Sequence, residues 1–171
     1  MKTTALLALL ILTAPLVRPA DTDSIESVVK ALYDVISGPA GKARDWARFR
    51  SLFADGARLI PMRNTPDGPA PAVLSPEDYI QRTTPNFEKN GFFETAVAQR
   101  IESFGSVAHV FSTYESRRGP GEKPFARGIN SFQLVRQGNA WKVMTILWDS
   151  EREGNPIPEK YLPRMNANER E

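Results

Sequence analysis

The spacing of apolar residues changes once along this 171-residue chain, close to residue 91. Before that point apolar side chains recur every three or four residues, which places them on one face of a helix. The expected helices span 24–37, 43–54 and 76–89. After it, segments rich in β-branched and aromatic residues are typical of strands. The expected strands span 92–103, 106–117, 126–136 and 140–149. Helices placed before a sheet, rather than between its strands, indicate an α+β fold with the helices on one face.

Proline and glycine mark the breaks between these segments. A short strand is expected over 57–62, followed by a Pro-rich surface loop over 63–74. Ser75, followed by a proline and with Asp78 three residues later, predicts a capped start for the third helix. Pro85 is expected to kink or split that helix.

The first twenty residues have the layout of a secretory signal. Lys2 precedes a largely apolar run over 5–17, and Ala20 stands just before Asp21. The run is shorter than the ~20 residues that a membrane helix needs, and Pro15 interrupts it, which argues against an uncleaved anchor. We therefore expect a secreted or periplasmic protein that leaves the membrane once residues 1–20 are removed.

Charge and composition exclude several classes of function. Residues 1–20 hold two of the 22 basic residues and no acidic one, so twenty charges of each sign remain. Without a basic stretch we expect no nucleic-acid partner. The absence of cysteine excludes disulfides and thiol catalysis, and a single histidine argues against a metal site. No cofactor motif is present, so no cofactor is expected. The length fits one domain over 21–150 with a polar tail over 151–171.

Four stretches carry a resemblance to a known superfamily. They are residues 31–34 (ALYD), 49–57 (FRSLFADGA), 128–134 (GINSFQL) and 141–148 (WKVMTILW). With the order of elements, they resemble the nuclear transport factor 2-like superfamily, which includes ketosteroid isomerase and the polyketide cyclases. The resemblance implies a cone-shaped α+β fold, in which a strongly curved antiparallel sheet packs on three N-terminal helices. It also implies a ligand pocket inside the cone and a homodimer through the outer face of the sheet.

Strand alternation and the match to ketosteroid isomerase together predict which side chains enter the cone. On 106–117 the match points the face of His109 inward. The inward set there is Val107, His109, Phe111, Thr113 and Glu115. On the last two strands it is Asn130, Phe132, Leu134, Val143, Thr145, Leu147 and Asp149. The expected ligand-binding residues are Tyr33, His109, Phe111, Thr113, Asn130, Phe132, Thr145, Leu147 and Trp148.

The sequence departs from ketosteroid isomerase at each catalytic position. That enzyme uses an aspartate base, with a tyrosine and a protonated acid around the oxyanion. By resemblance, Pro61 falls near the aspartate and Asn130 at the acid. Leu32 matches the tyrosine position, with Tyr33 one step aside. An asparagine can donate to an oxyanion, but without a base isomerase activity is not expected.

Two functional hypotheses follow. In the leading one the protein is no enzyme: it holds a small, mostly apolar ligand in the cone, or acts as an accessory or self-association domain. Arg127 could then bind a ligand carboxylate.

In the alternative, the protein is an isomerase, dehydratase or cyclase. His109 is the acid-base residue, Asp149 its candidate partner, and Asn130 and Tyr33 are hydrogen-bond donors. Glu115 lies roughly 20 Å from His109 along the strand, too far to pair with it directly. Against a catalytic role, His109 can also be a partly buried strand residue with one hydrogen bond.

Overall fold

The computed structural model describes residues 20–163, so most of the expected signal segment and the end of the tail lie outside the described residues. The helices are α1 (Ile25–Ile36), α2 (Trp46–Ser51), α3 (Pro76–Asn90) and the 3₁₀ turn η1 (Glu159–Tyr161). The strands are β1 (Phe53–Thr65), β2 (Gly68–Pro71), β3 (Phe93–Phe104), β4 (Val107–Arg117), β5 (Ala126–Gln137) and β6 (Ala140–Ser150). None of the described helices is long and apolar enough to cross a membrane.

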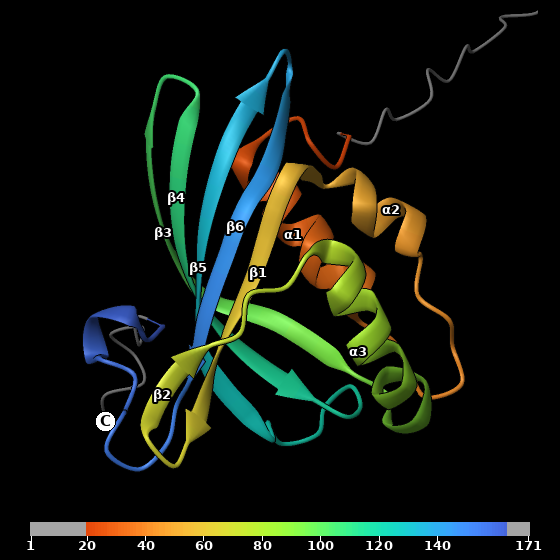
Figure 1. The fold of residues 1–171 in the computed structure, drawn as a ribbon, viewed down its shortest axis with the longest axis vertical. Coiled ribbons are helices and arrows are strands. Elements are labelled where there is room, and N and C mark those ends of the chain that lie inside the picture. Colours follow the sequence, from red (N-terminus) through yellow and green to blue (C-terminus); the bar gives the residue numbers. More distant parts are fainter. Residues whose placement is uncertain (1–19, 164–171) are drawn as a thin grey trace, which may run out of the picture.

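Within the described residues, six strands form one curved sheet in the order β2-β1-β6-β5-β4-β3. Figure 1 shows α1, α2 and α3 together on one side of this sheet. The α+β cone is thus confirmed, with one difference in strand direction. The sheet is mixed rather than wholly antiparallel, because β1 runs parallel to β6 while the other neighbours are antiparallel.

The N-terminal elements differ from the sequence prediction in their bounds. The expected loop over 63–74 contains a hairpin, in which β2 pairs with the end of a β1 that is longer than predicted. Pro69 and Pro71 are tolerated because β2 is an edge strand, where a missing N–H breaks no central ladder. The helix α3 continues past Pro85 without a split, and its predicted capping box between Ser75 and Asp78 is confirmed.

The core fills the space between the three helices and the inner face of the sheet. From α1, Val28, Val29 and Leu32 pack against the sheet, and each is at most 5% exposed. Burial of such side chains stabilises the fold by about 1.5–3 kcal/mol each. Phe49 of α2 stacks on Tyr79 of α3 with ring centroids 5.5 Å apart, which ties the two helices together. Leu32, Phe49 and Tyr79 of this core also line a cavity between the helices and the sheet.

The prediction that the His109 face of β4 enters the cone is wrong. Ser112 of β4 lies directly opposite Asn130 of β5, and His109 lies opposite Gln133. Side chains directly opposite in an antiparallel pair project from the same face of the sheet. Because Asn130 faces the helices, the inward residues of β4 are its neighbours on that face. They are Ala108, Val110, Ser112 and Tyr114, each at most 4% exposed.

The inward set predicted for β6 is correct only at its start. Val143 is fully buried, but a register shift follows, because Leu134 of β5 pairs with Val143 while Gln133 pairs with Thr145. The extra residue, Met144, forms a bulge that reverses the alternation of the strand. From there Ile146 and Trp148 face the helices. The predicted inward residues Thr145, Leu147 and Asp149 lie on the outer face.

Candidate functional site

A cavity of about 250 Å³ lies between the helices and the inner face of the sheet. Its wall is mainly aromatic and includes side chains from all three helices. The aromatic members are Tyr33, Phe49, Tyr79, Phe87, Phe92, Tyr114, Phe125, Phe132 and Trp148. Among the described residues that line it, Glu94 is the one of a type that is charged at neutral pH when its pKa is not shifted. The site is therefore an apolar cavity with a single carboxyl.

Glu94 is held by hydrogen bonds from two neighbouring strands. It is the second residue of β3, where Ser116 of β4 pairs with it and donates from Oγ to Glu94 Oε2 at 2.7 Å. Asn130 of β5 donates from Nδ2 to Glu94 Oε1 at 3.3 Å and to the Tyr33 hydroxyl at 3.0 Å. Tyr33 in turn donates to Ser112 Oγ at 2.8 Å. The cluster fixes the carboxyl at the cavity wall.

The surroundings of Glu94 oppose its negative charge. The residue keeps some accessible surface because it faces the cavity, but the protein around its carboxyl excludes bulk water. Burial raises the pKa of Glu94 to about 7, and the hydrogen bonds from Ser116 and Asn130 only partly offset this rise. Near neutral pH the carboxyl can therefore give or take a proton.

The tyrosines around Glu94 remain neutral hydroxyls. Burial, and then the negative charge of Glu94, raise the pKa of Tyr33 and of Tyr79 well above the ordinary value. Burial is also the largest cause at Tyr114, whose pKa rises to about 12. The Tyr114 hydroxyl is 3.1 Å from Ser150 Oγ, whereas the Tyr79 hydroxyl makes no hydrogen bond within the described part of the chain. Tyr79 is thus free to bond to a ligand.

The structure brings part of the predicted site together at this cavity. Tyr33, Asn130, Phe132 and Trp148 all line it. Asn130 donates to the Tyr33 hydroxyl, which donates to Ser112, so the donor groups that were assigned to a substrate are engaged within the protein. Glu94 was missed by the sequence reasoning. One signal for it was available in the sequence: a carboxylate directly follows Phe92 and Phe93, the two aromatic residues at the start of the predicted strand.

Five other candidates, His109, Phe111, Thr113, Thr145 and Leu147, do not line this cavity. His109 Nε2 is 3.1 Å from Ser131 Oγ on the outer face. Thr113 donates to the carbonyl of Tyr161 at 2.6 Å, so that the chain after β6 covers this part of the sheet. These positions follow from the orientation of β4 and from the bulge in β6.

The proposed pairing of His109 with Asp149 is not present. Their partners on β5, Gln133 and Ile129, are four residues apart, which corresponds to roughly 13 Å along the strand. Asp149 instead accepts a hydrogen bond from Arg152 at 2.6 Å. A general acid-base pair of His109 and Asp149 is therefore excluded by the geometry.

Arg127, the candidate carboxylate ligand, also lies outside the cavity. It is 3.4 Å from Glu115 and 3.3 Å from Glu151, so its charge is already balanced by protein carboxylates. Within residues 20–163, no group of three or more His, Asp or Glu side chains is placed to hold a metal ion.

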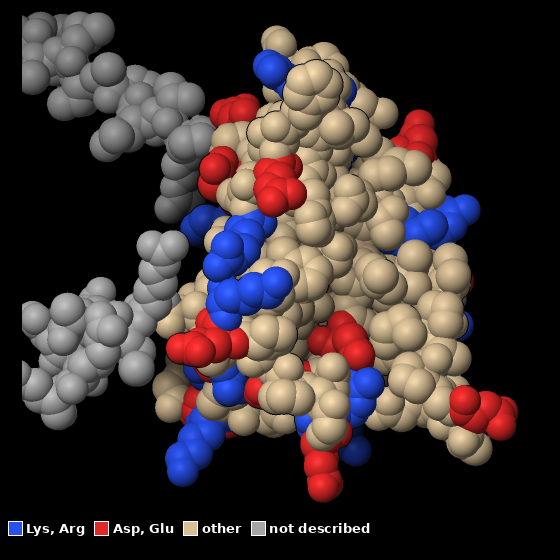
Figure 2. All heavy atoms as spheres, turned by 90° about the vertical axis from the view of Figure 1, so that its left-hand side faces the viewer, with Lys and Arg blue, Asp and Glu red and all other residues tan. Residues whose placement is uncertain are grey.

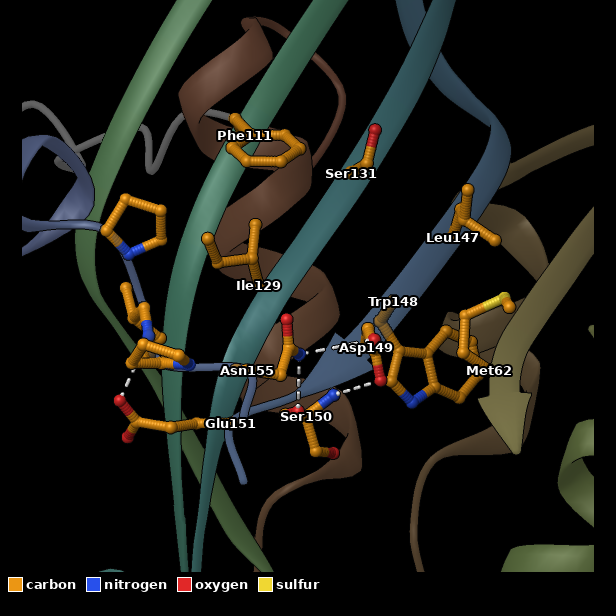
Figure 3. A pocket seen from close by; sticks show the side chains of 14 residues that line it. Met62, Phe111, Ile129, Ser131, Leu147, Trp148, Asp149, Ser150, Glu151 and Asn155 are labelled. Carbon is orange, nitrogen blue, oxygen red and sulfur yellow. Dashed lines mark hydrogen bonds between the residues drawn. The ribbon is translucent and has the colours of Figure 1, made fainter. Parts of the chain in front are cut away.

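A second hollow of about 230 Å³ lies on the outer face, beneath the segment 151–158. Figure 3 shows Phe111, Ile129 and Leu147 on its wall, with Asp149 bonded to Asn155 at its edge. Figure 2 shows that uncharged side chains cover much of this side of the molecule. The carboxylates at this hollow are engaged, because Asp149 bonds to Arg152 and Glu151 accepts from the backbone N–H of Ile157. Among the described residues at the outer hollow, Asp149 and Glu151 therefore each have an arginine as counter-charge, which Glu94 in the cone does not.

Comparisons with solved structures identify the fold. An NTF2-like protein of unknown function from Pseudomonas putida matches with a TM-score of 0.56 at 12% identity, covering 83% of this chain and 92% of that chain. A protein of unknown function with a cystatin-like fold from Nostoc punctiforme has a TM-score of 0.57 at 11% identity, covering 74% and 88%. A protein described as a candidate dehydratase from the NTF2-like family of Streptomyces avermitilis has a TM-score of 0.56 at 13% identity, covering 77% and 96%.

No family model and no curated protein sequence matches the chain. At these identities the likeness concerns the fold alone. The chain has the NTF2-like cone fold that its sequence resembles, and its function has to be argued from the cavity.

Proposed function

We propose that this protein binds a small, mostly apolar molecule in the cone, and that one polar group of this molecule bonds to Glu94. The observation that carries the proposal is a cavity of about 250 Å³ whose aromatic wall is interrupted by one carboxyl. An apolar cavity of ~150 Å³ is already large enough to bind benzene. Small-molecule sites typically combine such a lining with a few placed polar groups.

The polar groups are arranged to orient a ligand. Glu94 is held by Ser116 and Asn130, and Tyr79 offers a hydroxyl that has no partner in the described part of the chain. A preorganised site loses little conformational freedom when a ligand binds. We therefore expect Glu94 and Tyr79 to anchor the ligand while the rings surround its apolar body.

Calorimetric titration with 2-naphthol tests this proposal, since the probe joins a fused apolar ring to one hydroxyl. Thr83 lines the cavity from α3, so Thr83→Trp should fill it and lower the affinity for 2-naphthol at least about tenfold. Gln81→Trp, on the exposed side of the same helix, is the matched control and should bind as the unaltered protein does. Equal affinity in both variants, with both folded by circular dichroism, would show that the probe binds elsewhere.

Acid-base catalysis is a second candidate function, favoured by the pKa of about 7 at Glu94. A group that titrates near the working pH is suited to proton transfer, and the Tyr79 hydroxyl, which has no partner in the described part of the chain, can donate to a substrate oxygen. In this version of the isomerase, dehydratase or cyclase hypothesis, the acid-base residue is Glu94 and not His109. Loss of the base should lower turnover by ~10²–10⁴ while substrate still binds.

We also propose that the mature chain acts outside the cytoplasm and associates as a homodimer through the outer face. The layout of residues 1–20 supports export. Phe104, Val107 and Leu147 share the outer face by their register and are 87%, 56% and 41% exposed, which supports an apolar contact there.

A further inference from the structure

Building on the proposed function, we propose that the ligand is an organic cation: a protonated amine whose ammonium group pairs with Glu94 and whose apolar body lies among the aromatic rings. Two observations lead to this class of ligand. One is the balance of charge around Glu94, and the other is the number of aromatic faces at the same place.

The described part of the chain supplies Glu94 with hydrogen-bond donors but with no opposite charge. Asn130 and Ser116 both donate to its oxygens, an arrangement that suits a carboxylate. Among the described residues that line the cavity, none is Lys, Arg or His. A carboxylate removed from water is costly unless it is paired. A ligand that brings a positive charge therefore completes the site, whereas a ligand carboxylate would add a second negative charge beside Glu94.

Aromatic rings are placed around the same space. The rings of Tyr79 and Trp148 lie nearly perpendicular to each other, with centroids 6.4 Å apart, and Phe87 stacks on Phe92 at 4.4 Å. Both pairs belong to the cavity wall. The faces of such rings attract cations, and more strongly where water is excluded. An ammonium group at Glu94 would thus gain a counter-ion and aromatic contacts together.

Binding of a cation should displace a proton from Glu94. The titratable side chains that face it are Tyr33 of α1, Tyr79 of α3 and Tyr114 of β4, and all three remain protonated near neutral pH because their pKa values are raised. Glu94 is partly protonated near pH 7, because burial raises its pKa to about 7. Pairing with an ammonium group favours the carboxylate, so a proton is released to the buffer.

The test is calorimetric titration with benzylamine, a cation at pH 7, and with benzyl alcohol, which has a similar shape and no charge. Benzylamine should bind at least about tenfold more tightly than benzyl alcohol. Titrations in phosphate and in Tris should differ in heat, because binding of benzylamine releases protons from the partly protonated Glu94. Glu94→Gln should abolish the proton release and the preference for the amine. Glu102→Gln, at an exposed position of the same strand, should change neither.

The outcomes separate this inference from the function on which it rests. If benzyl alcohol binds as tightly as benzylamine, or if no proton is released, the cation is the wrong ligand class. A protein that binds 2-naphthol but not benzylamine overturns the inference and leaves the cone as a binding site. Because the comparison of the two benzyl compounds uses the unaltered protein, it holds even if Glu94→Gln does not fold.

Discussion

Glu94 contributes to the way in which the stability of this protein depends on pH. Burial raises its pKa from the ordinary value of 4.5 to about 7. Between these two values the folded chain holds a proton that the unfolded chain has lost, so stability falls as the pH rises through this window. Above pH 7 the loss is complete and amounts to up to about 3 kcal/mol. The protein thus retains a destabilising group in its interior, which is typical of a functional site.

Glu94→Gln removes this charge and keeps a similar shape. We predict that the variant is more stable than the unaltered protein at pH 8 and loses the fall in stability between pH 5 and pH 8. Urea unfolding at several pH values measures this, with the exposed Glu102→Gln as control. An unchanged pH profile in Glu94→Gln would mean that the carboxyl is well solvated.

At the scale of single residues the sequence predicted only part of the site. Tyr33 and Asn130 could be named because residues 31–34 and 128–134 carry the family resemblance. Glu94 could not, because its role depends on three strands that bring Ser116 and Asn130 to its carboxyl. The one local signal, a carboxylate directly after two phenylalanines, does not show that the side chain is buried.

At the scale of elements, helices and strands were predictable but the faces of two strands were not. The apolar spacing identified α1, the capping pattern at Ser75 identified α3, and β-branched and aromatic composition identified β3 to β6. On β4 both faces mix apolar and polar residues, so alternation alone cannot decide which one is buried. On β6 the bulge at Met144 reverses the alternation, and a bulge of one residue has no distinct signature here. As a result, residues of β4 and β6 that lie on the outer face of the sheet were predicted to line the cavity.

Gly128 of β5 shows how closely these strands are fitted. A Cβ at this position would lie 2.3 Å from the carbonyl of Asp149 and 2.6 Å from the hydroxyl of Tyr114, which is directly opposite on β4. We predict that Gly128→Ala lowers the free energy of unfolding by about 1–3 kcal/mol, because backbone or ring must move.

Chemical denaturation measures this change, and Gly119→Ala is the matched control. A Cβ at Gly119 would meet only the flexible end of Glu122. A similar effect in both variants would contradict the close approach at Gly128.

At the scale of the whole molecule, the order of elements predicted the cone, and the comparison with solved structures bears it out. The molecule has a hollow on each side of its sheet, and the two differ in chemistry. The cone holds a carboxyl without a counter-charge, whereas the acids of the outer hollow are bonded to their neighbours. This difference favours the cone, rather than the outer hollow, as the site of the proposed ligand.

The most direct test of this account is a crystal structure of the protein grown with 2-naphthol. We predict that the fused ring lies in the cone between α3 and the inner face of the sheet, with its hydroxyl within hydrogen-bond distance of Glu94 or Tyr79. A ring bound only in the outer hollow beside Phe111 and Leu147, with the cone unoccupied, would contradict it.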